Sequence, residues 1–211
     1  WRLALPRTVM LDALEPAVAS SFERAIDRLR AAGFEVAAVD LPALSDAASL
    51  QRGGGLSAAE SWAWHRHRLA ERQAQYDPRV ALRIRRGESM NAADYIDLLR
   101  ERSEWIERMG AALAPYDAML SPTVPIVAPP IAPLEASDDA FFATNALLLR
   151  NPSLVNLLDG CALSLPCHRD GDWPVGLMVW APALCDDRVL SLSLAIGRAL
   201  APLRHATRSG A

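Results

Sequence analysis

The sequence predicts an α/β fold in which helices cover a mixed β-sheet, and three observations lead to this prediction. Residues 1–42 alternate in strand, helix and strand patterns, residues 56–113 carry two long helical patterns, and two short apolar runs follow residue 160. A strand–helix–strand unit normally pairs its strands in parallel, which gives a sheet that helices cover. A length of 211 residues, 51% of them apolar, suits a single domain over residues 1–211.

The first predicted helix follows a short apolar strand at residues 3–5. Pro16 suits the first turn of this helix, because a proline there costs no helical hydrogen bond. Its buried face is indicated by apolar residues at three- and four-residue spacing, namely Val18, Phe22, Ile26 and Leu29. Gly33 favours a left-handed stop, and alternation over residues 35–41 predicts the second strand.

The middle of the chain predicts a loop and then two covering helices. The loop is expected at residues 43–55 and the first long helix at residues 56–75. The second helix is expected to begin at Asn91, whose side chain can accept a hydrogen bond from the backbone N–H of Asp94. Its apolar residues are expected to share one face: Ile96, Leu99, Ile106, Met109 and Leu113.

Five prolines between Ser121 and Pro133 predict extended, irregular backbone. Proline has no N–H to donate and breaks helices and central strands. After this segment, residues 139–158 are predicted as a helix broken at Pro152, and residues 187–200 as a closing helix. Residues 162–165 and 175–180 are predicted as buried strands.

Composition excludes several functions. The chain has 22 basic and 25 acidic residues and no basic block, so nucleic-acid binding is not expected. No apolar run approaches the roughly 20 residues of a membrane span, so membrane insertion is not expected either. All 22 basic residues are arginine, which stays protonated, so the chain alone cannot supply a lysine-based mechanism. Cys161, Cys167 and Cys185 lack paired CxxC spacing, which indicates neither a disulfide framework nor a metal site and favours a cytoplasmic location.

Other residues that attract attention have ordinary explanations. His65 and His67 stand two positions apart and do not share a helix face, so solvated or capping roles are expected rather than metal binding. Cys161 and Cys167 are expected to pack as small apolar side chains. The helical tryptophans are expected in the core: Trp62, Trp64 and Trp105.

A series of motifs in order resembles those of the amidase signature family and covers nearly the whole chain. Residues 116–130, Tyr-Asp-Ala-Met-Leu-Ser-Pro-Thr-Val-Pro-Ile-Val-Ala-Pro-Pro, are similar to the family's "yDallsPtvp..app". Residues 156–167 resemble "Nl.g.pa.slPc", residues 174–178 resemble "PvGlql", and residues 187–190 resemble "D..lL". Upstream, residues 58–65 and 76–87 are similar to "aaEa...H" and "yDp.v..Ri..G". Two positions depart from the family: Cys161 stands where proline is common and His168 where glycine is common.

The resemblance implies a hydrolase that opens a small carboxamide by acyl transfer, using a serine nucleophile, a bridging serine in a cis peptide and a lysine. The chain has no lysine and no counterpart of the Gly/Ser-rich nucleophile loop, since Gly53–Ser57 holds a single serine. We therefore expect a carboxy-terminal amidase portion without catalytic residues or cofactor, inactive alone, which agrees with its start at Trp1. The expected partner is the missing amino-terminal half, and self-association through the apolar surface left uncovered is also expected. The alternative is a non-catalytic binding or structural module derived from an amidase.

Four residues are the candidate substrate contacts. In amidases resembling allophanate hydrolase, a tyrosine and an arginine from this region hold the substrate carboxylate, which implies this role for Tyr76 and Arg83. An open alternative for Arg83 is a structural salt bridge. Thr123 and Asn156 are expected to face the substrate cleft, or else to hold irregular backbone.

Overall fold

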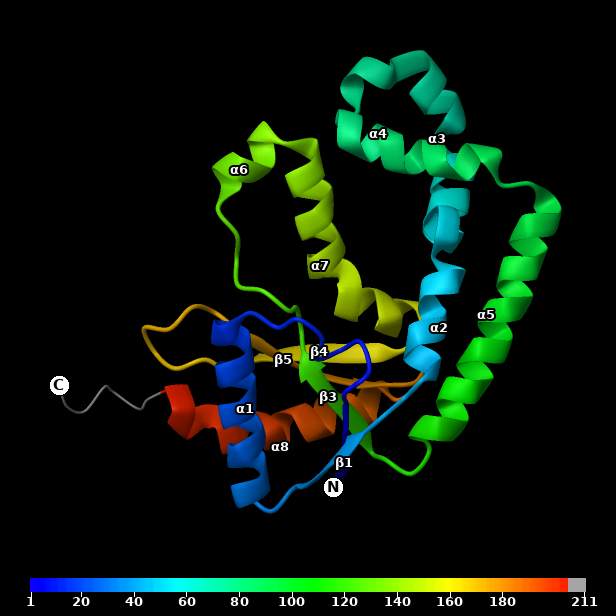
Figure 1. Cartoon of the computed structure of the whole chain (residues 1–211). Helices are drawn as coiled ribbons and strands as arrows, with labels where there is room; N and C mark the ends of the chain where they lie inside the picture. Colours follow the sequence, from blue (N-terminus) through cyan, green and yellow to red (C-terminus); the bar gives the residue numbers. More distant parts are fainter. Residues whose placement is uncertain (205–211) are drawn as a thin grey trace. The chain divides into compact units, whose positions relative to one another are not determined.

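The computed structural model describes residues 1–204, which form two compact units (Figure 1). Of the described residues, the first unit contains 1–45 and 109–204, and the second contains 46–108. A single domain over residues 1–211 stays a prediction, because a compact unit need not fold by itself. No helix among the described residues is long and apolar enough to cross a membrane.

A five-stranded mixed sheet is the centre of the first unit. Its strands are β1 (Arg2–Pro6), β2 (Glu35–Val39), β3 (Ala118–Pro122), β4 (Cys161–Pro166) and β5 (Gly176–Ala181), in the order β2-β1-β3-β5-β4. Strand β1 pairs in parallel with β2 and β3, and β5 runs antiparallel to both β3 and β4. The prediction of a mixed sheet with a parallel β1–β2 pair is therefore confirmed.

Helices α1 (Pro16–Ala31), α6 (Ile131–Ala136), α7 (Asp138–Leu157) and α8 (Asp186–Arg204) belong to the first unit. Helices α1 and α8 pack against each other, and the Nε of Arg28 donates to the carbonyl of Ala199 at 3.1 Å. The predicted apolar stripe of α1 is buried, and Gly33 has a φ of +89°, so both expectations for this helix are confirmed.

The second unit contains α3 (Gly55–Arg72) and α4 (Pro78–Arg85), with short 3-10 turns at Arg52–Gly54, Gln73–Gln75 and Arg86–Ser89. Its small core is a cluster of Leu69, Ala81 and Ile84, against which Trp62 and Tyr76 pack. Asp77 caps α4, because its Oδ1 accepts from the backbone N–H groups of Arg79 and Val80. Helices α2 (Ala43–Leu50) and α5 (Ala92–Leu113) continue across the limits of the two units.

Three backbone predictions are wrong. Residues 43–55 contain α2 and a 3-10 turn instead of a loop, because an alanine-rich segment after Pro42 is a good helix former even when it is short. The proline-rich segment is only partly irregular, since Pro122 ends β3 and Pro133 lies in α6. Helix α7 is not broken but continues through Pro152.

Burial corrects three further predictions. Strand β5 is buried, but exposure alternates along β4, which is the pattern of a strand with one covered face and one open face. The predicted cap of α5 is present, because Asn91 Oδ1 accepts from the backbone N–H of Asp94 at 3.0 Å. The predicted apolar face of this helix is only partly buried, since Ile96 is 62% exposed and Leu99 is 41% exposed. Trp105 is buried as expected, whereas Trp64 is 73% exposed.

A fully buried amide, that of Asn151, fastens α7 to the end of β3. Its Nδ2 donates to the carbonyl of Pro122 at 2.8 Å and to the carbonyl of Met10 at 3.1 Å, and its Oδ1 accepts from the Nε of Arg150. Arg150 also donates to the carbonyl of Asp12 at 2.7 Å. These contacts fix the position where the strand passes into the proline-rich segment.

Replacing Asn151 by alanine should reduce the free energy of unfolding by about 2–4 kcal/mol, because two backbone carbonyls lose their donor in a buried site. Urea denaturation measures this loss. The matched control is Asn156→Ala in the same helix, where an exposed amide should cost less than about 0.5 kcal/mol. Equal losses in the two variants would contradict the role given to Asn151.

Candidate functional site

Two hydroxyl groups meet at the carboxyl end of β3. The Oγ1 of Thr123 and the Oγ of Ser164 lie 2.6 Å apart, and the backbone N–H of Thr123 donates to the carbonyl of Gly176 at 2.9 Å. Gly176 belongs to β5, the strand between β3 and β4. A Cβ at Gly176 would collide with Ser164 Oγ and lie 2.6 Å from Thr123 Oγ1, so glycine is what allows the two hydroxyls to meet.

A third hydroxyl lies on the same face of the sheet. Ser121 and Ser164 both stand opposite Met178, so their side chains point to the same side. Ser121 Oγ is buried and has no hydrogen-bond partner among residues 1–204. We call Ser121, Thr123 and Ser164 the hydroxyl face. Each hydroxyl can donate and accept a hydrogen bond, which suits contact with a neutral polar group such as an amide.

The proline-rich segment next to the hydroxyl face is held by Glu15, at the start of α1. The backbone N–H of Glu15 donates to the carbonyl of Pro125, and its carboxylate Oε2 accepts from the N–H of Val127, both at 2.9 Å. Together with Asn151, this contact fixes the backbone on both sides of Thr123. No local sequence signal pointed to Glu15 or Asn151, because their partners are remote along the chain. The motif over residues 156–167 includes Ser164, but it did not indicate that Ser164 meets Thr123.

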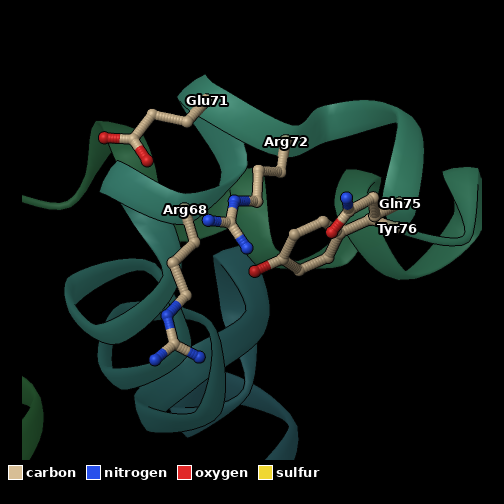
Figure 2. Close-up of a pocket in the computed structure, with 5 residues that line it drawn as sticks. All are labelled: Arg68, Glu71, Arg72, Gln75 and Tyr76. Atoms are coloured by element: carbon tan, nitrogen blue, oxygen red, sulfur yellow. The ribbon is translucent and has the colours of Figure 1, made fainter.

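The second unit has a cavity of about 510 Å³ lined by Arg68, Glu71, Arg72, Gln75 and Tyr76 (Figure 2). The hydroxyl of Tyr76 lies 2.9 Å from Nδ1 of His65, and the two rings meet edge to face with centroids 5.7 Å apart. The expected solvated or capping role of His65 is therefore replaced by a contact that positions the tyrosine.

The four predicted substrate contacts lie in different surroundings. Tyr76 lines the cavity of the second unit, whereas Arg83 is exposed on α4 and does not line it. Within residues 1–204 the Arg83 guanidinium has no hydrogen-bond or ion-pair partner, so the alternative salt bridge is not found there. Thr123 belongs to the hydroxyl face. Asn156 is exposed in the last turn of α7, and no hydrogen bond among the described residues joins Asn156 to Thr123.

The cysteines and histidines offer no alternative chemistry. Cys167 is buried, and burial raises the pKa of its thiol to about 12, while burial also raises the pKa of the Cys161 thiol. Both groups therefore disfavour the reactive thiolate at neutral pH, which agrees with the expectation that they pack. In the part of the chain that the structure describes, no group of three His, Cys, Asp or Glu side chains could hold a metal ion.

Comparison with known proteins gives a match to the Amidase family model over residues 1–190. The chain belongs to the amidase family. This confirms the resemblance seen in its motifs, and amidases act on carbon–nitrogen amide bonds.

Relatives of this amidase chain are about twice as long as the chain itself. It is 30% identical over 200 residues to 2-amino-5-chloromuconic acid deaminase of Comamonas testosteroni, covering 92% of the chain and 42% of that protein. It is 29% identical to a glutamyl-tRNA(Gln) amidotransferase subunit of Salinispora arenicola, covering 95% of the chain and 45% of the relative. The chain thus spans less than half the length of these curated relatives.

Solved structures confirm the amidase fold. A crystal structure of an amidase superposes with a TM-score of 0.76 at 27% identity, over 96% of this chain and 46% of that one. An allophanate hydrolase of Kluyveromyces lactis superposes with a TM-score of 0.80 at 22% identity, over 98% of this chain and 32% of that one. The predicted fold class is therefore confirmed.

Replacing Gly176 by alanine should separate the hydroxyls of Thr123 and Ser164 and reduce the free energy of unfolding by about 1–3 kcal/mol, because the new methyl group has no room. Gly197→Ala in α8 is the matched control. A Cβ there meets nothing within 4 Å, so the change should stabilise the protein by up to about 1 kcal/mol. Thermal unfolding of both variants measures the difference, and a stabilised Gly176→Ala protein would contradict the close packing.

Proposed function

We propose that this chain is the carboxy-terminal portion of an amidase that hydrolyses a small carboxamide by Ser-cisSer-Lys acyl transfer, with the triad outside the chain. The observation that carries the proposal is the absence of lysine from a sequence that matches the amidase model over residues 1–190. The base of such a triad must be an amine that can lose its proton, and arginine cannot do so. The lysine and both serines of the triad would come from the part of the amidase that this chain does not span.

In this proposal the chain supplies one wall of the substrate site. The hydroxyl face presents donors and acceptors on rigid strands, and rigid strands position substrate groups well. Thr123 contacts the substrate amide from this face, and Asn156 is retained as a second, exposed contact.

The proposed partner is the amino-terminal half of the amidase. Strand β4 has an uncharged edge, Cys-Ala-Leu-Ser-Leu-Pro, that pairs with no further strand among residues 1–204. An uncharged free edge is suited to adding a strand from another polypeptide. Without that half, the same edge and the exposed Leu190 and Leu194 of α8 favour self-association.

An acidic amide is the proposed substrate class. Two relatives have names that refer to acids or their anions, 2-amino-5-chloromuconic acid and allophanate. In residues 66–86, seven arginines accompany only two acidic residues, Glu71 and Asp77. Such an excess of positive charge favours the approach of anions. Tyr76 and Arg83 are the proposed carboxylate contacts.

The proposed location is the cytoplasm. The three cysteines are free thiols, which suits a reducing compartment.

The purified chain should show no turnover on a panel of acidic and neutral amides, because it has no base for the triad. Co-expression with the amino-terminal half encoded by the parent gene should restore hydrolysis in a co-purifying complex, measured as ammonia release. Hydrolysis by the chain alone would contradict the proposal. A stable complex that remains inactive would instead favour the non-catalytic module.

In the assembled enzyme, Arg83→Leu should reduce kcat/KM for an acidic amide by roughly 30- to 1000-fold, because a charge-assisted contact of about 2–4 kcal/mol is lost. A neutral amide of the same size should be almost unaffected. Arg66→Leu, at another exposed arginine of the second unit, is the control for a general change in charge. Equal losses on the two substrates would exclude Arg83 as the carboxylate contact.

A further inference from the structure

We infer that Cys161 and Cys185 form an oxidisable pair, which a low-molecular-weight disulfide converts into an intrachain disulfide bond. Cys161 is the first residue of β4, and Cys185 directly precedes α8, the helix that packs against β4. Both are free thiols in the structure, and both are partly exposed, so a small oxidant can reach them. The third cysteine, Cys167, is buried.

The turn between β5 and α8 brings the two cysteines together. Cys161 stands opposite Ala181, the last residue of β5, and its thiol donates to the carbonyl of Pro182 at 3.6 Å. The chain then turns at Leu184, which has a left-handed φ of +62°, and reaches Cys185. The Cys161 thiol therefore lies against the turn that ends at Cys185.

The surroundings of the Cys161 thiol include both the backbone and the side chain of Cys185. Burial raises the pKa of the Cys161 thiol, and the carboxylate of Asp186 and the thiol of Cys185 raise it further, whereas a hydrogen bond from the backbone N–H of Cys185 lowers it. A cysteine sulfur is three bonds from its own backbone nitrogen. Rotation about χ1 of Cys185 therefore moves its sulfur toward the sulfur that its N–H already contacts.

Cys167 is an internal control for this pairing. It lies beyond the other end of β4, six residues from Cys161, which corresponds to about 20 Å along a strand. In an unfolded chain, by contrast, a bond between Cys161 and Cys167 closes a shorter loop than a bond between Cys161 and Cys185, and short loops close at a lower entropic cost. Folding should therefore reverse the preferred partner of Cys161.

Oxidised glutathione is an oxidant of the required class. One cysteine thiolate attacks a sulfur of oxidised glutathione, which gives a mixed disulfide and releases one glutathione thiolate. The second cysteine thiolate attacks the protein sulfur of the mixed disulfide and releases the other glutathione. The two leaving thiolates take up the two protons that the cysteines lose. Two cysteine thiols are thus oxidised while one oxidised glutathione is reduced to two thiols.

The bond would fasten the start of the edge strand β4 to the start of α8. This strand carries Ser164 of the hydroxyl face. Cys161 is one of the two positions at which the chain departs from the amidase motifs, and the proline common there could not form the bond. The inference therefore goes beyond the proposed amide hydrolysis and does not depend on it.

Oxidation of the purified chain with oxidised glutathione, at low protein concentration and mildly alkaline pH, tests the pair. Remaining thiols are blocked with N-ethylmaleimide, and the unreduced protein is digested with trypsin and analysed by mass spectrometry. Two of the three thiols should be lost, and the peptides 151–169 and 170–188 should be joined. Because the first peptide contains both Cys161 and Cys167, three matched variants assign the bond. Cys167→Ala should keep the joined peptides, whereas Cys161→Ala and Cys185→Ala should each lose them.

Thermal unfolding gives a second readout. Oxidation should raise the Tm of the wild-type protein and of Cys167→Ala by roughly 3–10 °C, because the bond restricts the unfolded chain. It should not raise the Tm of Cys161→Ala or Cys185→Ala. Circular dichroism checks that each variant is folded, and a serine variant replaces any alanine variant that is not.

Four results would overturn the inference. They are no joined peptides, joined peptides that persist in Cys161→Ala or Cys185→Ala, joined peptides found only in covalent dimers on a non-reducing gel, and a Tm that oxidation lowers. Oxidation in concentrated urea separates the folded pairing from chance pairing. There the bond between Cys161 and Cys167 should dominate, and an equal yield of the Cys161–Cys185 bond with and without urea would also contradict the inference.

Discussion

The first unit depends on how a backbone rich in proline obtains its hydrogen bonds. Prolines in residues 121–133 remove N–H donors but keep their carbonyl groups, which need donors from elsewhere when they are buried. Asn151 supplies one donor to Pro122 from α7, and the N–H of Glu15 supplies another to Pro125 from the start of α1. An unpartnered carbonyl in such a site would cost about 1–3 kcal/mol, so these contacts decide where the segment lies.

The hydroxyl face follows from that constraint. Thr123 is the residue after Pro122, so the contact that fixes Pro122 also fixes the side chain that meets Ser164. Gly176 contributes by having no side chain at the point where the two hydroxyls approach. The resulting surface can orient a polar substrate, but it contains no base, because its polar side chains are hydroxyls. This division agrees with a chain that forms a substrate wall while another part of the amidase performs acyl transfer.

Local signals in the sequence predicted much of the fold, and remote contacts explain what they missed. Pro16, Gly33 and the Asn91–Asp94 cap act within a few residues, so each could be recognised from the sequence. The continuation of α7 through Pro152 could not be recognised from the sequence. The hydrogen bonds that Asn151 makes at this point reach carbonyl groups 141 and 29 residues earlier in the chain. Family motifs suggested Thr123 and Tyr76 as candidate contacts, and their roles stay predictions. The pairing of Thr123 with Ser164 spans 41 residues, so no local signal could reveal it.

We propose that the nucleophile lies outside this chain, and serine-directed covalent labelling can locate it. The complex with the amino-terminal half would be treated with a sulfonyl fluoride, digested, and analysed by mass spectrometry to locate the modified serine. We expect one modified serine in the amino-terminal half and none in this chain, whether the chain is complexed or alone. Stoichiometric modification of Ser121 or Ser164, with loss of activity, would contradict it.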